Sequence, residues 1–104
     1  MSQIYVMRKV LYIAETALVI ADGASVYFKS IYISNSHNAA VKSTLAITRG
    51  QSFSAVGDYI IYEYSLAAGE YLKLEDIAIP VGHQLRAFSN HNALTSVVGT
   101  GIME

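Results

Sequence analysis

The chain has 104 residues, a length that fits a single domain with one thin core. Charged residues make up 14% of it, against about 25% in typical globular chains, so we expect part of the outer surface to be buried against other chains. The scattered lysines and arginines and the net charge of −1 argue against a nucleic-acid partner, and the absence of cysteine excludes disulfides and cysteine-ligated metal.

Short apolar segments with a period of two, separated by Gly and Asn turns, predict strands along the first half of the chain. Residues Gln3–Ile13 are rich in β-branched and aromatic side chains and are predicted as a strand or an N-terminal arm. A helix is the alternative there, because the apolar residues also match a helical spacing. Further strands are predicted over Thr16–Ala21, Ser25–Ser34 and Val41–Thr48.

The alternation changes phase within Ser25–Ser34. Val26 and Phe28 share one face, while the isoleucines at 31 and 33 share the other. An extra residue near Lys29-Ser30 would put all four side chains on the core side, which is typical of a β-bulge.

The second half of the chain continues the pattern. Gln51–Asp58 is a Ser- and Gly-rich loop with one irregular edge strand expected around Phe53. A second phase slip separates Leu72 and Leu74 from the isoleucines at 77 and 79, and the intervening Glu75-Asp76 is expected to be a solvated turn. The strands predicted in this half are Tyr59–Ser65, Glu70–Leu74, His83–Phe88 and Leu94–Met103.

Eight or nine short strands without intervening helices predict an all-β fold, an antiparallel β-sandwich of jelly-roll type. No linker-like stretch divides the chain, so residues 1–104 are expected to form one domain. Gly99 and Gly101 lie within the last predicted strand and are expected to mark a bulge or a close backbone contact.

The sequence contains no catalytic motif. It has no Gly-x-Ser-x-Gly elbow, no phosphate-binding glycine loop and no His-x-His pair, so we expect no enzyme, cofactor or metal site. The histidines at 37, 83 and 91 are interpreted as surface loop residues. No apolar run approaches the roughly 18 residues of a membrane span, and the start lacks the pattern of a signal peptide.

Tyrosine is the clearest binding signal in the chain. All eight tyrosines fall in predicted strands, and Tyr27 and Tyr71 lie opposite core residues. Outward tyrosines are enriched at protein–protein interfaces, although the same residues could form a sugar-binding platform. We predict interface roles for Tyr5, Tyr12, Tyr27 and Tyr71.

Three stretches of the sequence resemble small virion proteins of tailed bacteriophages. They are Val26–Asn35, the Leu66–Leu74 segment with Ile77–Ala87 after it, and the closing Gly101–Glu104, and the likeness extends over about residues 16–104. The shared order is a strand, an Ala-Gly-Glu turn, a Leu-rich strand, a Gly-containing turn and a Val-rich final strand.

The resemblance implies a β-sandwich that coats or cements a capsid or builds tail, neck or fibre parts, and it implies no catalytic residues. It also implies a homo-oligomer, with a trimer favoured, and the major capsid protein or other virion proteins as partners. The expected location is the virion, after synthesis in the host cytoplasm. A tail- or fibre-associated module that binds a glycan or receptor is the alternative.

Overall fold

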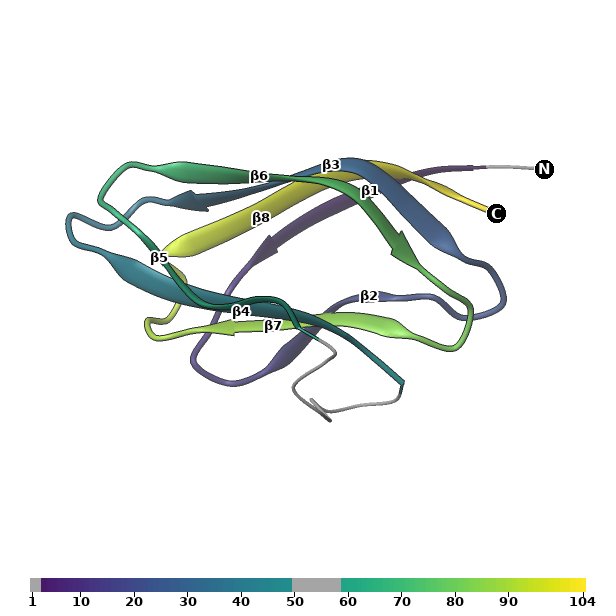
Figure 1. The fold of residues 1–104 in the computed structure, drawn as a ribbon, viewed down its shortest axis with the longest axis horizontal. Helices are drawn as coiled ribbons and strands as arrows, with labels where there is room; N and C mark the ends of the chain where they lie inside the picture. The colour runs from purple at the N-terminus through teal and green to yellow at the C-terminus, as the bar shows by residue number, and fades with distance from the viewer. Residues whose placement is uncertain (1–2, 50–58) are drawn as a thin grey trace.

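The computed structural model describes residues 3–49 and 59–104, and it folds them into two antiparallel sheets packed face to face (Figure 1). The edge strand expected around Phe53 lies outside these residues. The all-β sandwich predicted from the alternation is confirmed. Its strands are β1 (Gln3–Val10), β2 (Thr16–Ile20), β3 (Val26–Asn35), β4 (Val41–Thr48), β5 (Tyr59–Leu66), β6 (Tyr71–Ile79), β7 (Gln84–Ser89) and β8 (Thr95–Met103).

The strands pair from the two ends of the sequence inward, like one long hairpin. β1 pairs with β8, β2 with β7, β3 with β6 and β4 with β5, all antiparallel. Contacts of β3 with β8 and of β4 with β7 then roll this hairpin into two sheets. Sheet A has the strand order β1-β8-β3-β6 and sheet B has β2-β7-β4-β5, which is a jelly roll.

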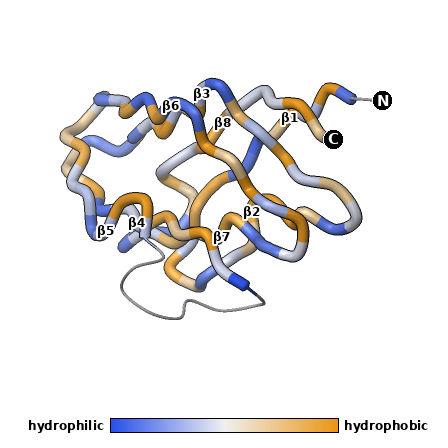
Figure 2. The backbone as a smooth tube through the Cα atoms, turned by 45° about the vertical axis from the view of Figure 1, so that its right-hand side comes forward, coloured by the Kyte–Doolittle hydropathy of each residue, from blue (hydrophilic) through white to orange (hydrophobic). Residues whose placement is uncertain are grey.

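The core lies between the sheets and is built from the inward residues of both. Hydrophobic residues recur along the strands of both layers, between hydrophilic stretches (Figure 2). The largest fully buried side chains are Phe28, Met7, Leu11, Ile31, Ile33, Leu45, Ile79, Leu85, Val19, Val26, Val41 and Val97. Burial of these side chains, at roughly 1.5–3 kcal/mol each, is the main favourable contribution to folding.

The first predicted phase slip is confirmed as a bulge. The register between β3 and β8 shifts between Phe28 and Ser30, so that Lys29 has no opposite residue on β8. Because of this extra residue, Val26, Phe28, Ile31 and Ile33 are all buried.

The second slip occurs inside one continuous strand, which corrects the turn expected at Glu75-Asp76. Asp76 has a positive φ of 56°, a left-handed conformation that Asp tolerates better than most residues. This one residue restores the phase, so Ile77 and Ile79 face the core as Leu72 and Leu74 do. Phe28 pairs with Ile77 and Ser30 pairs with Glu75, so Lys29 on β3 and Asp76 on β6 lie side by side. Because each strand has its extra residue at the same place, the β3–β6 pairing keeps one register on both sides of it.

Residues Gln3–Val10 form a strand and not the alternative helix. All eight pair with β8 in an unbroken register from Gln3 opposite Met103 to Val10 opposite Ser96. The segment is therefore the outer strand of sheet A.

Gly99 and Gly101 mark a close backbone contact, as expected. A Cβ on Gly101 would overlap the carbonyl oxygen of Tyr27 and lie 2.9 Å from Cδ1 of Phe28. A Cβ on Gly99 would lie 3.1 Å from the same ring atom. The two glycines thus leave the space in sheet A that the Phe28 ring occupies.

We expect Gly101→Ala to lower the free energy of unfolding by about 2–3 kcal/mol, because the new methyl group meets backbone that cannot move aside. Thr100→Val is the matched control, since Thr100 lies between the glycines but points to solvent, and its effect should stay within about 0.5 kcal/mol. Urea unfolding monitored by circular dichroism measures both. Equal stabilities for Gly101→Ala and the wild type would contradict the close contact.

Asn35 ties together the turns at one end of the sandwich. Its buried Nδ2 donates to the carbonyl oxygens of Ala39, Leu66 and Ala67 at 2.9–3.1 Å, and its Oδ1 accepts the backbone N–H of His37 at 2.8 Å. One side chain therefore joins the β3–β4 turn to the β5–β6 turn.

Replacing Asn35 with Ala should cost about 2–4 kcal/mol of unfolding free energy, because the carbonyl of Leu66 loses a buried donor and those of Ala39 and Ala67 lose a partly buried one. Asn38→Ala tests the same turn at an exposed position and should cost less than about 0.5 kcal/mol. Thermal and urea unfolding measure the stability of both variants. An equal loss of unfolding free energy in Asn35→Ala and Asn38→Ala would contradict the role of Asn35.

Candidate interaction surface

The surface that stands out is the solvent side of sheet A, called here the outer face. Strand register places its residues in rows that cross the sheet from β1 to β6. Among the described residues, no helix or strand packs on this side of sheet A (Figure 1). From β1 to β6 the rows are Ile4, Ile102, Tyr27 and Ala78; Val6, Thr100, Ser30 and Glu75; Arg8, Val98, Tyr32 and Lys73; and Val10, Ser96, Ser34 and Tyr71.

The first of these rows is apolar across the whole sheet. Ile4 is 79% exposed, Ile102 44% and Tyr27 41%, and Val6 lies beside Ile4 at 58%. Large aliphatic side chains gathered in this way are costly in water, and contiguous exposed patches mark interaction sites.

Tyr27 is held in place at the surface by its polar end. Its hydroxyl donates a hydrogen bond to Oδ1 of Asp76, the residue at the β6 slip. This hydrogen bond, together with burial and the nearby negative charge, raises the pKa of Tyr27 above its ordinary value of 10.0. The slip in β6 thereby positions an aromatic ring on the outer face.

A second aromatic group lies at the other end of the face. The rings of Tyr32 and Tyr71 are 6.0 Å apart between centroids and tilted by 51°. Nζ of Lys73 lies 5.8 Å from the centre of the Tyr32 ring and 3.3 Å from Oε1 of Glu75. Its hydrogen bond with Glu75 raises the pKa of Lys73, with further contributions from the charges of Tyr32 and Glu75.

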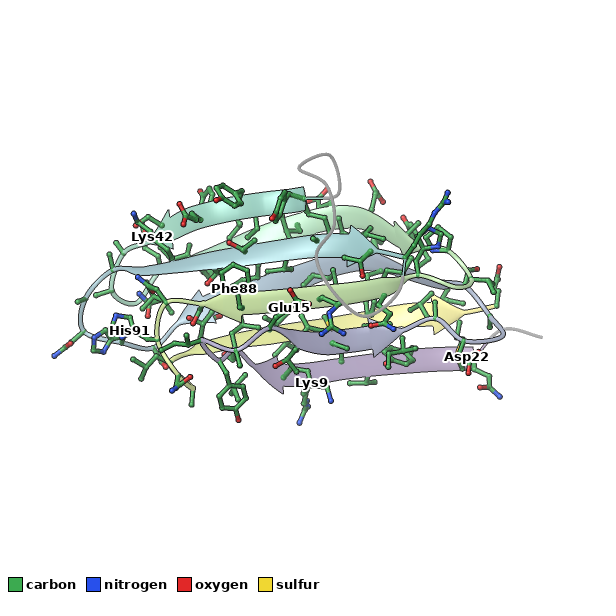
Figure 3. The ribbon with its side chains drawn as sticks, turned by 90° about the horizontal axis from the view of Figure 1, so that it is seen from below. Lys9, Glu15, Asp22, Lys42, Phe88 and His91 are labelled. Carbon is green, nitrogen blue, oxygen red and sulfur yellow. The ribbon has the colours of Figure 1, made fainter. Side chains whose placement is uncertain are left out.

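The solvent side of sheet B differs from the outer face. Arg86 forms an ion pair with Glu15 at 2.6 Å and a hydrogen bond with Gln84 at 2.9 Å. Two residues of β4 that point away from the core, Thr44 and Ala46, are nonetheless buried, whereas Lys42 on the same side is exposed. Figure 3 shows Glu15 and Phe88 on this side.

The four tyrosines predicted at an interface lie in three places. Tyr27 and Tyr71 are on the outer face, and Tyr71 is 66% exposed. Tyr12 is exposed on the connection between β1 and β2. Tyr5 points inward and packs edge-on against Phe28, with ring centroids 5.9 Å apart, so it is not part of the outer face.

The aliphatic members of the outer face were not among the predicted site residues. Ile4, Val6 and Ile102 are more apolar than the tyrosines. In the last strand, glycines at 99 and 101 alternate strictly with larger residues at 98, 100 and 102, and this alternation indicates that Ile102 points outward. A strand whose inward positions are glycines has its large side chains on the other side.

The histidine loops meet at one end of the sandwich. The rings of His37 and His91 are 5.2 Å apart between centroids, and Ser36 bonds to the carbonyl of Leu94 through both its backbone N–H and its hydroxyl. His83 lies in the β6–β7 turn. Within residues 3–49 and 59–104, no three His, Asp or Glu side chains gather as metal ligands, and no helix is long and apolar enough to cross a membrane.

Comparison with known proteins gives no family for this chain. No protein-family model and no curated protein sequence matches it. Two solved structures are similar to this chain: that of infectious bursal disease virus strain Gx, with 10% identity and a TM-score of 0.47, and that of the T13 particle of the same virus, with 9% identity and a TM-score of 0.48. The alignments cover 99% and 98% of this chain but only 31% and 30% of those chains. At this level of similarity the likeness does not bear on function.

We expect the hydrogen bond between Tyr27 and Asp76 to be visible in a titration. The neutral phenol donates this bond, so its contribution to stability is present below pH 10 and is lost as the pH rises through the raised pKa. NMR of carbon-13-labelled tyrosine should show Tyr27 titrating above its ordinary value. Asp76→Asn should lower that midpoint, whereas Asp22→Asn in the β2–β3 turn should not. An unchanged midpoint in Asp76→Asn would contradict the contact.

Proposed function

We propose that this protein is a non-enzymatic structural subunit of a virus particle, bound to the particle and to sister copies through exposed faces of its sandwich. The observation that carries the proposal is the uncovered apolar row of Ile4, Ile102 and Tyr27 on the outer face, with Val6 beside it. The low charge content of the chain also supports it, because few charged groups would need to be desolvated on assembly.

The chemistry of the outer face fits a protein partner. Aliphatic side chains at one end supply apolar area, at roughly 25 cal/mol for each Å² removed from water. The tyrosines supply large contact area with few rotatable bonds and keep a polar end. A subunit repeated many times over a particle needs only modest affinity at each contact, because the contacts act together.

At a finer level, we propose a capsid decoration or cement protein of a tailed bacteriophage. This proposal rests on the resemblance of Val26–Asn35 and Leu66–Leu74 to such virion proteins. The partners would be sister copies and the major capsid protein, and the location would be the virion after synthesis in the host cytoplasm. The trimer that the resemblance implies stays a prediction.

One observation favours a second candidate, a tail- or fibre-associated module that binds a glycan. A shallow hollow on the outer face is lined by Tyr32 together with Lys29, Ser30 and Thr100. An aromatic ring beside hydrogen-bonding groups can hold a sugar ring. Binding of the wild type to a glycan array, lost in Tyr32→Ala, would support this function in place of the structural one.

The structural role predicts regular label on particles. Virus particles purified from the organism that encodes the chain should carry gold-conjugated antibody against it on heads or tails. Recombinant protein should also bind particles that lack it. Ile102→Lys should reduce this binding at least tenfold, because a charge would then be buried in the apolar row.

Ile20→Lys is the matched control, since Ile20 is an exposed isoleucine on sheet B, at 59%. It should bind particles like the wild type. Particles without label, or equal binding by both lysine variants, would overturn the proposed use of the outer face.

A further inference from the structure

The four sheet edges of the described structure are not equally protected. An exposed edge presents unpaired N–H and C=O groups, and proteins usually interrupt it with bulges, charges or short strands. β6 is interrupted by the left-handed Asp76 and β5 by the left-handed Glu63. β2 has only five residues and a register shift between Ala17 and Val19.

β1 is not interrupted in this way, and its two charged residues, Arg8 and Lys9, both lie near one end of the strand. It has eight residues, pairs with β8 without a register shift, and contains no residue with positive φ. Figure 3 shows β1 (purple) along one rim of the molecule, with Lys9 pointing away from it. Ile4 and Val6, at 79% and 58% exposed, lie along this rim. The edge is therefore straight, accessible and partly apolar.

The register fixes which backbone groups of β1 face outward. The N–H of Leu11, the next residue along the chain, donates to the carbonyl of Thr95 at 2.8 Å, and these two residues continue the β1–β8 register. Hydrogen-bonded and non-bonded pairs alternate along an antiparallel ladder. The odd-numbered residues of β1 thus bond to β8, while the backbone groups of Ile4, Val6, Arg8 and Val10 face the free edge.

We propose that β1 pairs antiparallel with β1 of a second copy, about a two-fold axis at Val6. The outward-facing backbone groups then bond one another, with Val6 opposite Val6 and Ile4 opposite Arg8. The two copies of sheet A become one continuous eight-stranded sheet. The contact is isologous, as in most dimers.

The charges of β1 favour a second copy over an unrelated strand. Its charged residues, Arg8 and Lys9, both lie near one end of the strand. In the proposed register Arg8 meets Ile4 and Lys9 meets Gln3, so no like charges stand opposite one another. The two Arg8 side chains are roughly 13 Å apart along the strands. Tyr5 meets Met7, which extends the inner apolar layer across the contact.

This contact deepens the proposed structural role and rests on it, since it supplies the bond between sister copies. It uses the edge of sheet A and leaves the apolar row of Ile102 and Tyr27 free for the particle. A two-fold contact joins copies in pairs, so a trimer would need another surface.

Cross-linking tests the register directly, because the chain has no cysteine of its own. In the proposed pair the two Val6 Cα atoms lie about 5.5 Å apart, within the range of a disulfide. Val6→Cys should form covalent dimers under mild oxidation, and reductant should reverse them. Ile4→Cys is the matched control on the same strand and face. It should stay monomeric on a denaturing gel, since its copies are roughly 13 Å apart along the strands.

A proline variant tests the backbone pairing. Val6→Pro removes an N–H that faces the free edge and not one that bonds to β8, so the fold should persist. Light scattering should show the mass of two chains for the wild type and of one chain for Val6→Pro, with matching circular dichroism. Val6→Thr keeps the N–H and should remain dimeric.

These experiments distinguish failure of the β1 contact from failure of the proposed structural role. Efficient cross-linking of Ile4→Cys would overturn the register, and a trimer without cross-linking of Val6→Cys would overturn the β1 contact while leaving the structural role intact. Specific Val6→Cys dimers from a chain that binds no particle would support the contact and overturn the proposed function.

Discussion

The pairing of β3 with β8 is the constraint on which the rest of the structure depends. It joins the β1–β8 pair to the β3–β6 pair and so makes sheet A. Two features of the sequence make this pairing possible. Gly99 and Gly101 leave space for the Phe28 ring, and the extra residue at Lys29 turns Ile31 and Ile33 toward the core. Without the first the strands would clash, and without the second half of β3 would present its isoleucines to solvent.

The same pairing determines the outer face. Because the inward positions of β8 are glycines near Phe28, its bulk lies outward as Val98 and Ile102. The register then sets Ile102 between Ile4 and Tyr27, and Val98 between Arg8 and Tyr32. The glycines that make room for Phe28 in the core thus leave the large side chains of β8 on the surface, in the apolar row. The core and the candidate site are formed by opposite faces of the same strand.

Much of the fold was predictable from local alternation. Both phase slips were visible, since pairs such as Val26 with Phe28 and Ile31 with Ile33 cannot share a face without an extra residue. The local structure at the second slip was not predictable. The residues Glu75-Asp76 are compatible both with a turn and with a left-handed Asp76 inside a continuous strand. The orientation of Tyr5 was also hidden, since Ile4, Tyr5 and Val6 are all apolar and give no period of two. Which strands pair, and hence which tyrosines gather with which aliphatic residues, depends on contacts distant in sequence.

The nested order of the pairs has a consequence for how the chain folds during synthesis. β8, which lies between β1 and β3, leaves the ribosome after all the other strands. Until then β1 has no partner in sheet A and β3 is paired only with β6, so completion of the sheet must wait for contacts that span nearly the whole sequence. Topologies of this kind fold slowly, in milliseconds to seconds. During this interval the nascent chain is exposed to wrong pairing with its neighbours, and a chaperone would have most effect then.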